Sequence, residues 1–259
     1  MFYRISVFIL AVCLAPAILH GQSLPASGES QVTPEKLTAQ ELEQRGDAFR
    51  SQKDFVGALQ HYDLALKKTP KNAVVWNKAG MAELQLGRFD QAKRRFDRAV
   101  KLKKDYAEAV NNLGVVHYKR GSYRRAISQY RKAIALRDAA SFHSNLGTVY
   151  FDQKKYELAM AEYLRALAID PEVLERTSAT GISAHVSKPE DRARYAFMLA
   201  KLYATAGDTE HCLGQLRRAM ENGYPNLKDA VQKDDVFATV RQDPKFVELI
   251  HAEVPGITQ

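Results

Sequence analysis

The sequence predicts an all-α protein built as a solenoid of helix-turn-helix pairs, closed at its C-terminal end by a helical cap. Three observations predict this fold class. Glycine and alanine recur at a 34-residue step, aromatic residues recur at two other places in the same step, and glycine or proline stands where turns are expected. The chain has 259 residues, 46% hydrophobic and 26% charged, a composition that is ordinary for a folded protein.

The first segment of the chain is expected to lie outside this fold. Arg4 is followed by an apolar run at 5–19, interrupted only by Ser6, and then by the small residue Gly21. This order is typical of a secretory signal peptide, and as a helix the run would span about 22 Å, less than the bilayer core of about 30 Å. We therefore expect residues 1–21 to be a cleaved signal peptide and the protein to be periplasmic or secreted. The alternative is a membrane anchor, formed by an uncleaved signal or by a lipid on Cys13.

Residues 22–33 are rich in Ser, Gly, Gln and Pro, and are expected to form a flexible leader. Thr33, Pro34 and Glu35 then suit the start of a helix, because Thr can cap, Pro fits the first helical position and Glu complements the helix dipole.

The repeat begins at Ala39. Four units follow at 39–72, 73–106, 107–139 and 140–172, the last starting one residue early. With the first residue of each unit as position 1, small residues occupy positions 8, 20 and 27: Gly46, Gly80, Gly114 and Gly147; Ala58, Ala92, Ala126 and Ala159; Ala65, Ala99, Ala133 and Ala166. Aromatic residues occupy positions 17 and 24: Phe55, Phe89, Tyr123 and Tyr156; Tyr62, Phe96, Tyr130 and Tyr163.

This spacing predicts two antiparallel helices in each unit, an A helix and a B helix, joined by a turn that holds Gly87 in the second unit and Gly121 in the third. The small residues let the two helices approach closely, and the aromatic rings fill the space between them. Because no single pair buries its apolar face, the units must stack.

The pattern resembles the tetratricopeptide repeat, a 34-residue helix-turn-helix, over residues 39–172. The resemblance implies a right-handed α-solenoid. The sequence departs from the family pattern at position 32, where Lys104 and Asp138 replace the proline seen at Pro70 and Pro171, and at position 11, where Glu83 replaces an aromatic residue.

After the fourth unit the rhythm changes. Residues 173–192 are expected to be an irregular insertion, and residues 193–226 a weaker fifth unit with Cys212 buried at position 20 and Thr209 in place of the aromatic residue at position 17. Residues 227–259 are expected to form the helical cap, because solenoids need their last apolar face covered. Its covering residues are predicted to be Phe237, Val240, Phe246 and Ile250.

The sequence contains no His-Glu-x-x-His, no phosphate-binding glycine loop with Lys and Ser/Thr, and no Gly-x-Ser-x-Gly. Ser183 and His185 lie close together in the insertion, but such a pair needs tertiary support to act as nucleophile and base. His117 and His143 fall on A helices, where core or semi-buried roles are expected. No ligand spacing connects the histidines. We expect no enzyme activity, no metal and no cofactor.

In a tetratricopeptide array the A helices line the concave groove and positions 2, 5, 9 and 12 point into it, which implies a partner-binding site there. The predicted groove residues are Glu43, Asp47, Asn77, Met81, Leu84, Asn111, Val115, Tyr118, Ser144, Thr148 and Phe151. We expect Met81, Leu84, Val115, Tyr118 and Phe151 to anchor a bound helix or extended segment, and Asn77 and Asn111 to hydrogen-bond its backbone. The alternative is that some anchors only pack against the facing helix.

Known arrays of co-chaperones grip a terminal carboxylate with basic and amide side chains in the first unit. Glu43 and Asp47 stand there in this chain and would repel a carboxylate. The sequence therefore excludes that kind of clamp.

The chain carries a formal net charge of +8, which favours anionic surfaces. Its basic residues concentrate on the second and third B helices, on the predicted convex side: Arg94, Arg95, Arg98, Lys101, Arg124, Arg125, Arg131 and Lys132. We expect either an ordinary solvated face or a contact with anionic lipid or an acidic envelope polymer. Nucleic acid would be the natural partner only if the chain were not exported.

Together these observations predict a non-catalytic scaffold of the cell envelope that binds a peptide or helix in its groove. The alternative is an accessory subunit of an envelope assembly that associates through the basic convex face. A third possibility, an enzyme built on the insertion, would require an ordered pocket around Ser183 and His185. The partner, the pathway and the oligomeric state do not follow from the sequence.

Overall fold

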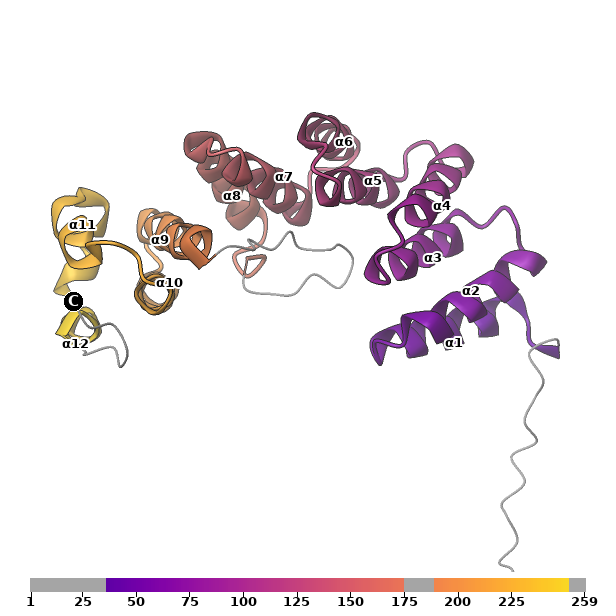
Figure 1. Ribbon diagram of the computed structural model, residues 1–259, viewed down its shortest axis with the longest axis horizontal. Helices are drawn as coiled ribbons and strands as arrows, with labels where there is room; N and C mark the ends of the chain where they lie inside the picture. The colour runs from indigo at the N-terminus through magenta and orange to yellow at the C-terminus, as the bar shows by residue number, and fades with distance from the viewer. Residues whose placement is uncertain (1–35, 175–188, 252–259) are drawn as a thin grey trace, which may run out of the picture. The chain divides into compact units, whose positions relative to one another are not determined.

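The computed structural model describes residues 36–174 and 189–251. Within these ranges the chain forms helices and turns and contains no strand (Figure 1). The predicted fold class, a solenoid of helix pairs, is confirmed. The predicted signal peptide at 1–21, the leader at 22–33 and the helix start at Thr33 lie outside the described residues.

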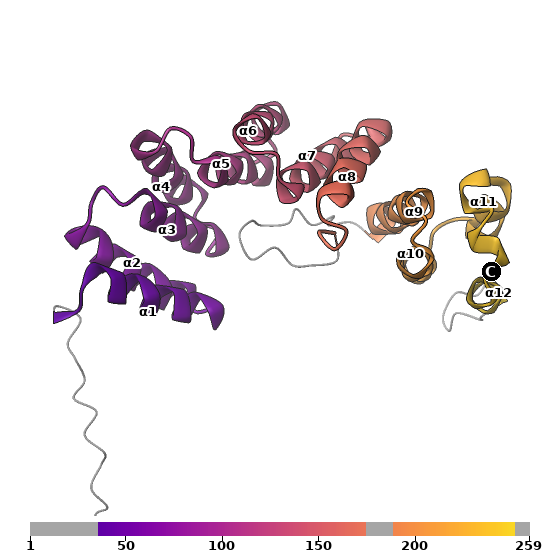
Figure 2. The same cartoon turned by 180° about the vertical axis from the view of Figure 1, so that it is seen from behind.

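Four helix pairs follow one another, each A helix beside its own B helix (Figures 1 and 2). Every A helix begins at position 1 of its unit and every B helix at position 17. The pairs are α1 (Ala39–Ser51) and α2 (Phe55–Lys68), α3 (Ala73–Gln85) and α4 (Phe89–Leu102), α5 (Ala107–Lys119) and α6 (Tyr123–Leu136), and α7 (Ala140–Asp152) and α8 (Tyr156–Ile169).

The helix ends follow from local chemistry. Thr38 caps α1 in a capping box, its hydroxyl accepting from the Glu41 N–H while the Glu41 carboxylate accepts from the Thr38 N–H. Each A–B turn contains a left-handed residue at position 15, which is Gly87 (φ 72°) in the second unit and Lys53 (φ 62°) in the first. Glycine adopts this conformation without strain and lysine does not. The turns of the first and second units therefore have the same backbone shape but differ in strain energy at position 15.

The interior of each unit is closed by the contact between positions 8 and 24. A Cβ placed on Gly114 would lie 2.6 Å from the ring of Tyr130, and one on Gly46 would lie 2.5 Å from the ring of Tyr62. Real side-chain carbons do not approach so closely. The rings of Tyr62, Phe96, Tyr130 and Tyr163 are fully buried, so glycine at position 8 is required by the ring that covers it.

The fifth pair consists of α9 (Pro189–Thr205) and α10 (Thr209–Glu221). Here the structure differs from the predicted boundary, because α9 begins at Pro189 and not at Ala193. Proline suits the first helical position, and acidic Asp191 follows it in the first turn, where the helix dipole favours negative charge. Cys212 is fully buried as predicted, and burial raises the pKa of its thiol to about 12.

The chain then forms α11 (Leu227–Lys233), two short 3-10 helices at Asp235–Phe237 and Val240–Gln242, and α12 (Pro244–His251). Phe237, Val240, Phe246 and Ile250 are buried in the same core cluster as Leu216 of α10. The predicted covering of the last pair is thus confirmed.

None of the helices in 36–174 and 189–251 combines the length and the apolar character needed to cross a membrane.

Candidate functional site

The A helices are tied to one another by a ladder of polar bonds that runs from unit to unit. In each case the side chain at position 6 of one unit donates to position 5 of the unit before it. Lys78 donates from Nζ to Glu43 Oε1 at 2.5 Å and also to Asp47 Oδ2 at 2.6 Å. Burial lowers the pKa of Lys78, but the hydrogen bonds to Asp47 and Glu43 outweigh burial and raise it. The ammonium is therefore held charged between the first two units.

The same bond is made by amides at the next two junctions. Asn112 Nδ2 donates to Asn77 Oδ1 at 3.0 Å, and Asn145 Nδ2 donates to Asn111 Oδ1 at 3.1 Å. These amides are at most 5% exposed. The prediction that Asn77 and Asn111 bond the backbone of a partner is therefore wrong, because both amides are buried and their acceptors are already used between units.

The predicted apolar anchors are also part of the interior. Leu84, Val115, Tyr118 and Phe151 are at most 8% exposed and belong to the core. Phe151 shows why, since its ring packs edge-on against Tyr195 of α9 with the centroids 5.1 Å apart. These four residues pack against facing helices, as the alternative prediction had it. The predicted anchor patch is wrong for all its members but Met81, which is partly buried.

The remaining predicted groove residues are polar. Thr148 is buried, with its hydroxyl 3.0 Å from the Ser144 carbonyl oxygen and 2.9 Å from the Tyr163 hydroxyl. Glu43, Asp47, Met81 and Ser144 stay half-buried and are the predicted residues that a partner can still reach. We call these four residues the A-helix face.

Asp152 at the end of α7 extends the acidic character of these helices. It accepts a hydrogen bond from the Tyr118 hydroxyl at 2.6 Å. Burial raises the pKa of Asp152, and the hydrogen bond from Tyr118 partly opposes this. Burial also raises the pKa of Tyr118, so that its hydroxyl stays a donor.

The predicted basic face divides into two groups. Arg95 binds Asp63 through two nitrogens at 2.5 and 3.1 Å, and Arg131 donates to the Tyr150 hydroxyl at 2.8 Å, so these two side chains hold neighbouring helices together. The other six make no ion pair with the described residues: Arg94, Arg98, Lys101, Arg124, Arg125 and Lys132. They form what we call the outer basic patch of α4 and α6.

The histidines have structural surroundings. His143 lies between two carboxylates, with Nδ1 2.6 Å from Glu162 and Nε2 2.7 Å from Asp138. His117 is nearly buried, and burial lowers its pKa. Core or semi-buried roles are thus confirmed for both. Within 36–174 and 189–251 no group of three metal-ligating side chains is assembled. Ser183 and His185 lie outside the described residues.

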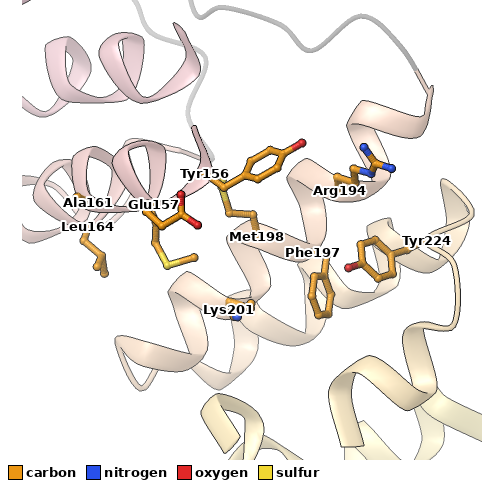
Figure 3. A pocket seen from close by; sticks show the side chains of 10 residues that line it. Tyr156, Glu157, Ala161, Leu164, Arg194, Phe197, Met198, Lys201 and Tyr224 are labelled. Carbon is orange, nitrogen blue, oxygen red and sulfur yellow. The ribbon is translucent and has the colours of Figure 1, made fainter. Parts of the chain in front are cut away.

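Sequence reasoning missed a pocket between α8 and α9. It has a volume of about 670 Å³ and is lined mainly by apolar side chains, among them Met160, Leu164, Phe197 and Tyr224 (Figure 3). Its signal in the sequence is Met198, which stands at position 6 of the fifth unit. A methionine there cannot donate the bond that closes the three earlier junctions.

The fold and the ladder define a helical repeat protein whose units share one register. Residues 77–138 and 116–173 match the family model described as tetratricopeptide repeat. This part of the chain is therefore similar to tetratricopeptide repeats, and the helix pairs on either side continue the same arrangement of paired helices.

Two curated relatives match part of the chain. Small glutamine-rich tetratricopeptide repeat-containing protein 2 of Saccharomyces cerevisiae is 27% identical over 99 residues, which are 38% of this chain and 29% of that protein. Hsp70-Hsp90 organizing protein of Triticum aestivum is 30% identical over 98 residues, which are 38% of this chain and 17% of that protein. The chain thus matches less than a third of the length of either relative.

A solved structure extends the likeness. The crystal structure of a thermophilic tetratricopeptide-repeat protein of Thermus thermophilus aligns with a TM-score of 0.52 at 21% identity, covering 78% of this chain and all of that one. This similarity shows the fold.

Proposed function

We propose that the protein is a non-catalytic scaffold of the cell envelope that binds a polypeptide segment along its A-helix face. Tetratricopeptide repeats commonly mediate contacts between proteins. The observation that carries the proposal is the ladder from Glu43 to Asn145, which holds the A helices of four units in one register. A partner would therefore meet a preorganised row of side chains, and little ordering entropy would be lost on binding.

The open residues suggest what kind of segment binds. Glu43 and Asp47 are only partly neutralised by Lys78, and Ser144 and Met81 follow along the array. Such a row suits a neutral or basic segment with a small apolar residue opposite Met81. It disfavours an acidic segment or a free carboxyl terminus, because the carboxylates of Glu43 and Asp47 stand there, held by Lys78 and, at Asp47, also by Arg50 at 3.8 Å.

The test uses the full chain expressed in its native cells with a photo-reactive amino acid placed at single positions. Met81 and Ser144 carry the probe on the A-helix face, and Arg94 and Arg125 carry it on the outer basic patch. We expect the same protein to be cross-linked from Met81 and Ser144 and not from the outer patch. Equal cross-linking from all four positions, or none from the A-helix face, would remove the proposal.

A second candidate function rests on the outer basic patch, whose six side chains make no ion pair with the described residues. In this case the chain would be an accessory subunit held at a membrane surface or an acidic polymer. Sedimentation with vesicles made with and without anionic phospholipid tests it. Binding should require the anionic lipid, weaken with salt and fall when Arg94, Arg98 and Arg125 are changed to Gln, because screened surface charges are the source of attraction.

Export is part of the proposal and has its own test. We propose that residues 1–21 direct the chain out of the cytoplasm, on the basis of the basic, apolar and small-residue order of that segment. Mass spectrometry of the native protein should give a new N-terminus near Gln22. An N-terminus at Met1 in protein recovered from the cytoplasm would contradict it.

A further inference from the structure

The outward surface of α8 differs from that of the other three B helices. Position 22 is exposed in each of the four units, and position 25 lies beside the next unit, where Asp63 binds Arg95 and Arg131 binds Tyr150. Both positions are polar or charged in the first three units: Gln60, Arg94 and Ser128; Asp63, Asp97 and Arg131. In the fourth unit the same positions are Ala161 and Leu164. Ala161 is exposed and Leu164 is half-buried, so this face of α8 carries an apolar strip. An accessible apolar strip on a surface helix marks a contact.

The opening beside this strip lies where α9 follows α8. Residues 137–139 separate α6 from α7, but residues 170–188 separate α8 from α9. At the junction of α8 and α9, Tyr195 packs on Tyr163 with the ring centroids 5.8 Å apart and closes one edge. The other edge, where Met198 replaces the ladder donor, remains open as the pocket.

Two rows of side chains form the walls of the pocket (Figure 3). On α8 they are Glu157, Met160, Ala161 and Leu164, and on α9 they are Arg194, Phe197, Met198 and Lys201. Both rows have the spacing i, i+3, i+4, i+7, so each is one face of a helix. Two such faces side by side form a groove into which the apolar face of a third helix fits.

The charges on the groove indicate the polar border of that helix. Lys201 pairs with Asp234, Nζ to Oδ2 2.7 Å. Arg194 is exposed and makes no ion pair with the described residues, while Glu157 carries a negative charge on the opposite wall. An incoming helix therefore gains most from a carboxylate near Arg194 and from a neutral or basic side chain near Glu157.

We propose that this groove, which we call the α8–α9 groove, binds an amphipathic helix of a partner protein. The α8 wall from Glu157 to Leu164 is about 10 Å long, which equals two helical turns. The partner helix presents apolar residues at i, i+3 or i+4, and i+7, and an Asp or Glu beside Arg194. One wall of this groove belongs to the A helix of the fifth unit, but none of the four residues of the A-helix face lines it, so its occupant and the segment proposed there are different contacts.

The test uses two synthetic helical peptides with the same leucine stripe, one with Glu on its polar border and one with Lys. Binding of each labelled peptide to the full chain is measured by fluorescence anisotropy. We expect the Glu peptide to bind roughly tenfold more tightly than the Lys peptide, because its carboxylates meet Arg194. The variant Arg194→Glu should reverse this preference, an effect that loss of folding cannot produce.

The matched pair of variants is Ala161→Asp and Ser128→Asp, since both residues are exposed at position 22 of a B helix. The Ala161→Asp change should weaken the Glu peptide at least tenfold, and the Ser128→Asp change should leave it unaltered. Equal binding by the wild type and Ala161→Asp, or an unchanged preference in Arg194→Glu, would overturn the proposal.

The same variants and peptides also distinguish two other possible occupants of the groove. If the groove joins two copies of this chain, light scattering will show a dimer that Ala161→Asp dissociates. If it holds an acyl chain, a fluorescent fatty acid will bind and the Glu peptide will not displace it. Either result overturns the partner-helix proposal. Cross-linking from Met81 on the A-helix face tests the proposed function separately, because Ala161→Asp leaves that face unchanged.

Discussion

The first four helix pairs and the fifth solve the same packing problem with different residues. In the first four, glycine at position 8 faces an aromatic ring at position 24, and a Cβ on that glycine would lie between 2.5 and 2.9 Å from the ring. In the fifth pair these positions are Ala200 and Leu216, both fully buried. The methyl group added to the A helix is matched by a smaller side chain on the B helix.

The comparison shows that the repeat keeps a filled volume, and that no single residue type is required. Protein interiors are close-packed, so a change on one helix must be answered on its neighbour. At the ladder the change in the fifth unit is not answered by a neighbouring residue. Where position 6 is Lys78, Asn112 or Asn145 the units are bonded together, and where it is Met198 a pocket opens.

The largest effect is expected from breaking the ladder at its charged step. Changing Lys78→Met gives the second unit the same residue type that the fifth has at position 6. Glu43 and Asp47 would then lose their shared ammonium while half-buried, and the free energy of unfolding should fall by roughly 3 kcal/mol. Urea titration followed by circular dichroism measures this loss.

The pH dependence of the difference in unfolding free energy between the wild type and Lys78→Met is a further check. Because the pKa of Lys78 is raised above 10.5 in the folded state, its contribution should be constant near neutral pH and disappear as the pH rises through the lysine range. A Lys78→Met protein as stable as the wild type would show that the ladder does not hold the units together.

The next effect comes from the contact between positions 8 and 24. Gly114→Ala should lower the free energy of unfolding by about 2 kcal/mol, because the new methyl group overlaps the ring of Tyr130. Adding Tyr130→Leu recreates the Ala and Leu pair of the fifth unit and should recover about 1 kcal/mol of the summed loss.

The control for that pair is Gly214→Ala. Gly214 is exposed inside α10 and a Cβ there meets nothing within 4 Å, so this variant should gain about 0.5 to 1 kcal/mol through helix propensity alone. If the changes in unfolding free energy of Gly114→Ala and Tyr130→Leu simply add in the double variant, positions 8 and 24 do not compensate each other in volume.

A smaller effect is expected from removing the hydroxyl groups of the tyrosines at position 24. The Tyr62 hydroxyl donates to Asp47 at 2.7 Å, whereas the Tyr130 hydroxyl is buried and finds no hydrogen-bond partner among the described residues. Tyr62→Phe should therefore cost about 1 kcal/mol, and Tyr130→Phe should be neutral or slightly stabilising. The second unit already carries Phe96 at this position. Equal losses in both variants, measured by urea titration, would show that the Tyr130 hydroxyl is satisfied.

The fold was predictable because its signal is repetition. Gly114 and Tyr130 each have an equivalent residue 34 positions away, so the same packing argument applies to every unit. The start of α9 at Pro189 is a local feature that does not repeat, and the repeat pattern did not predict it. The site was less predictable. Sequence position indicates that Asn111 and Phe151 lie on A helices, but the neighbouring unit decides whether they are open, and that contact depends on how far the helices slide together.

The smallest effect concerns the turn between the two helices of a unit. Position 15 has a left-handed backbone in all five units, as Lys53, Gly87, Gly121, Lys154 and Gly207. Changing Lys53→Gly should relieve local strain and raise the free energy of unfolding by about 0.5 kcal/mol, the gain being limited by the extra freedom of glycine in the unfolded chain. Gly121→Ala should lower it by about 1 kcal/mol although nothing lies within 4 Å of the new Cβ, so that the loss comes from the backbone alone. If Lys53→Gly and Gly121→Ala change stability in the same direction in urea titration, the turns of the first and third units do not share one backbone conformation in solution.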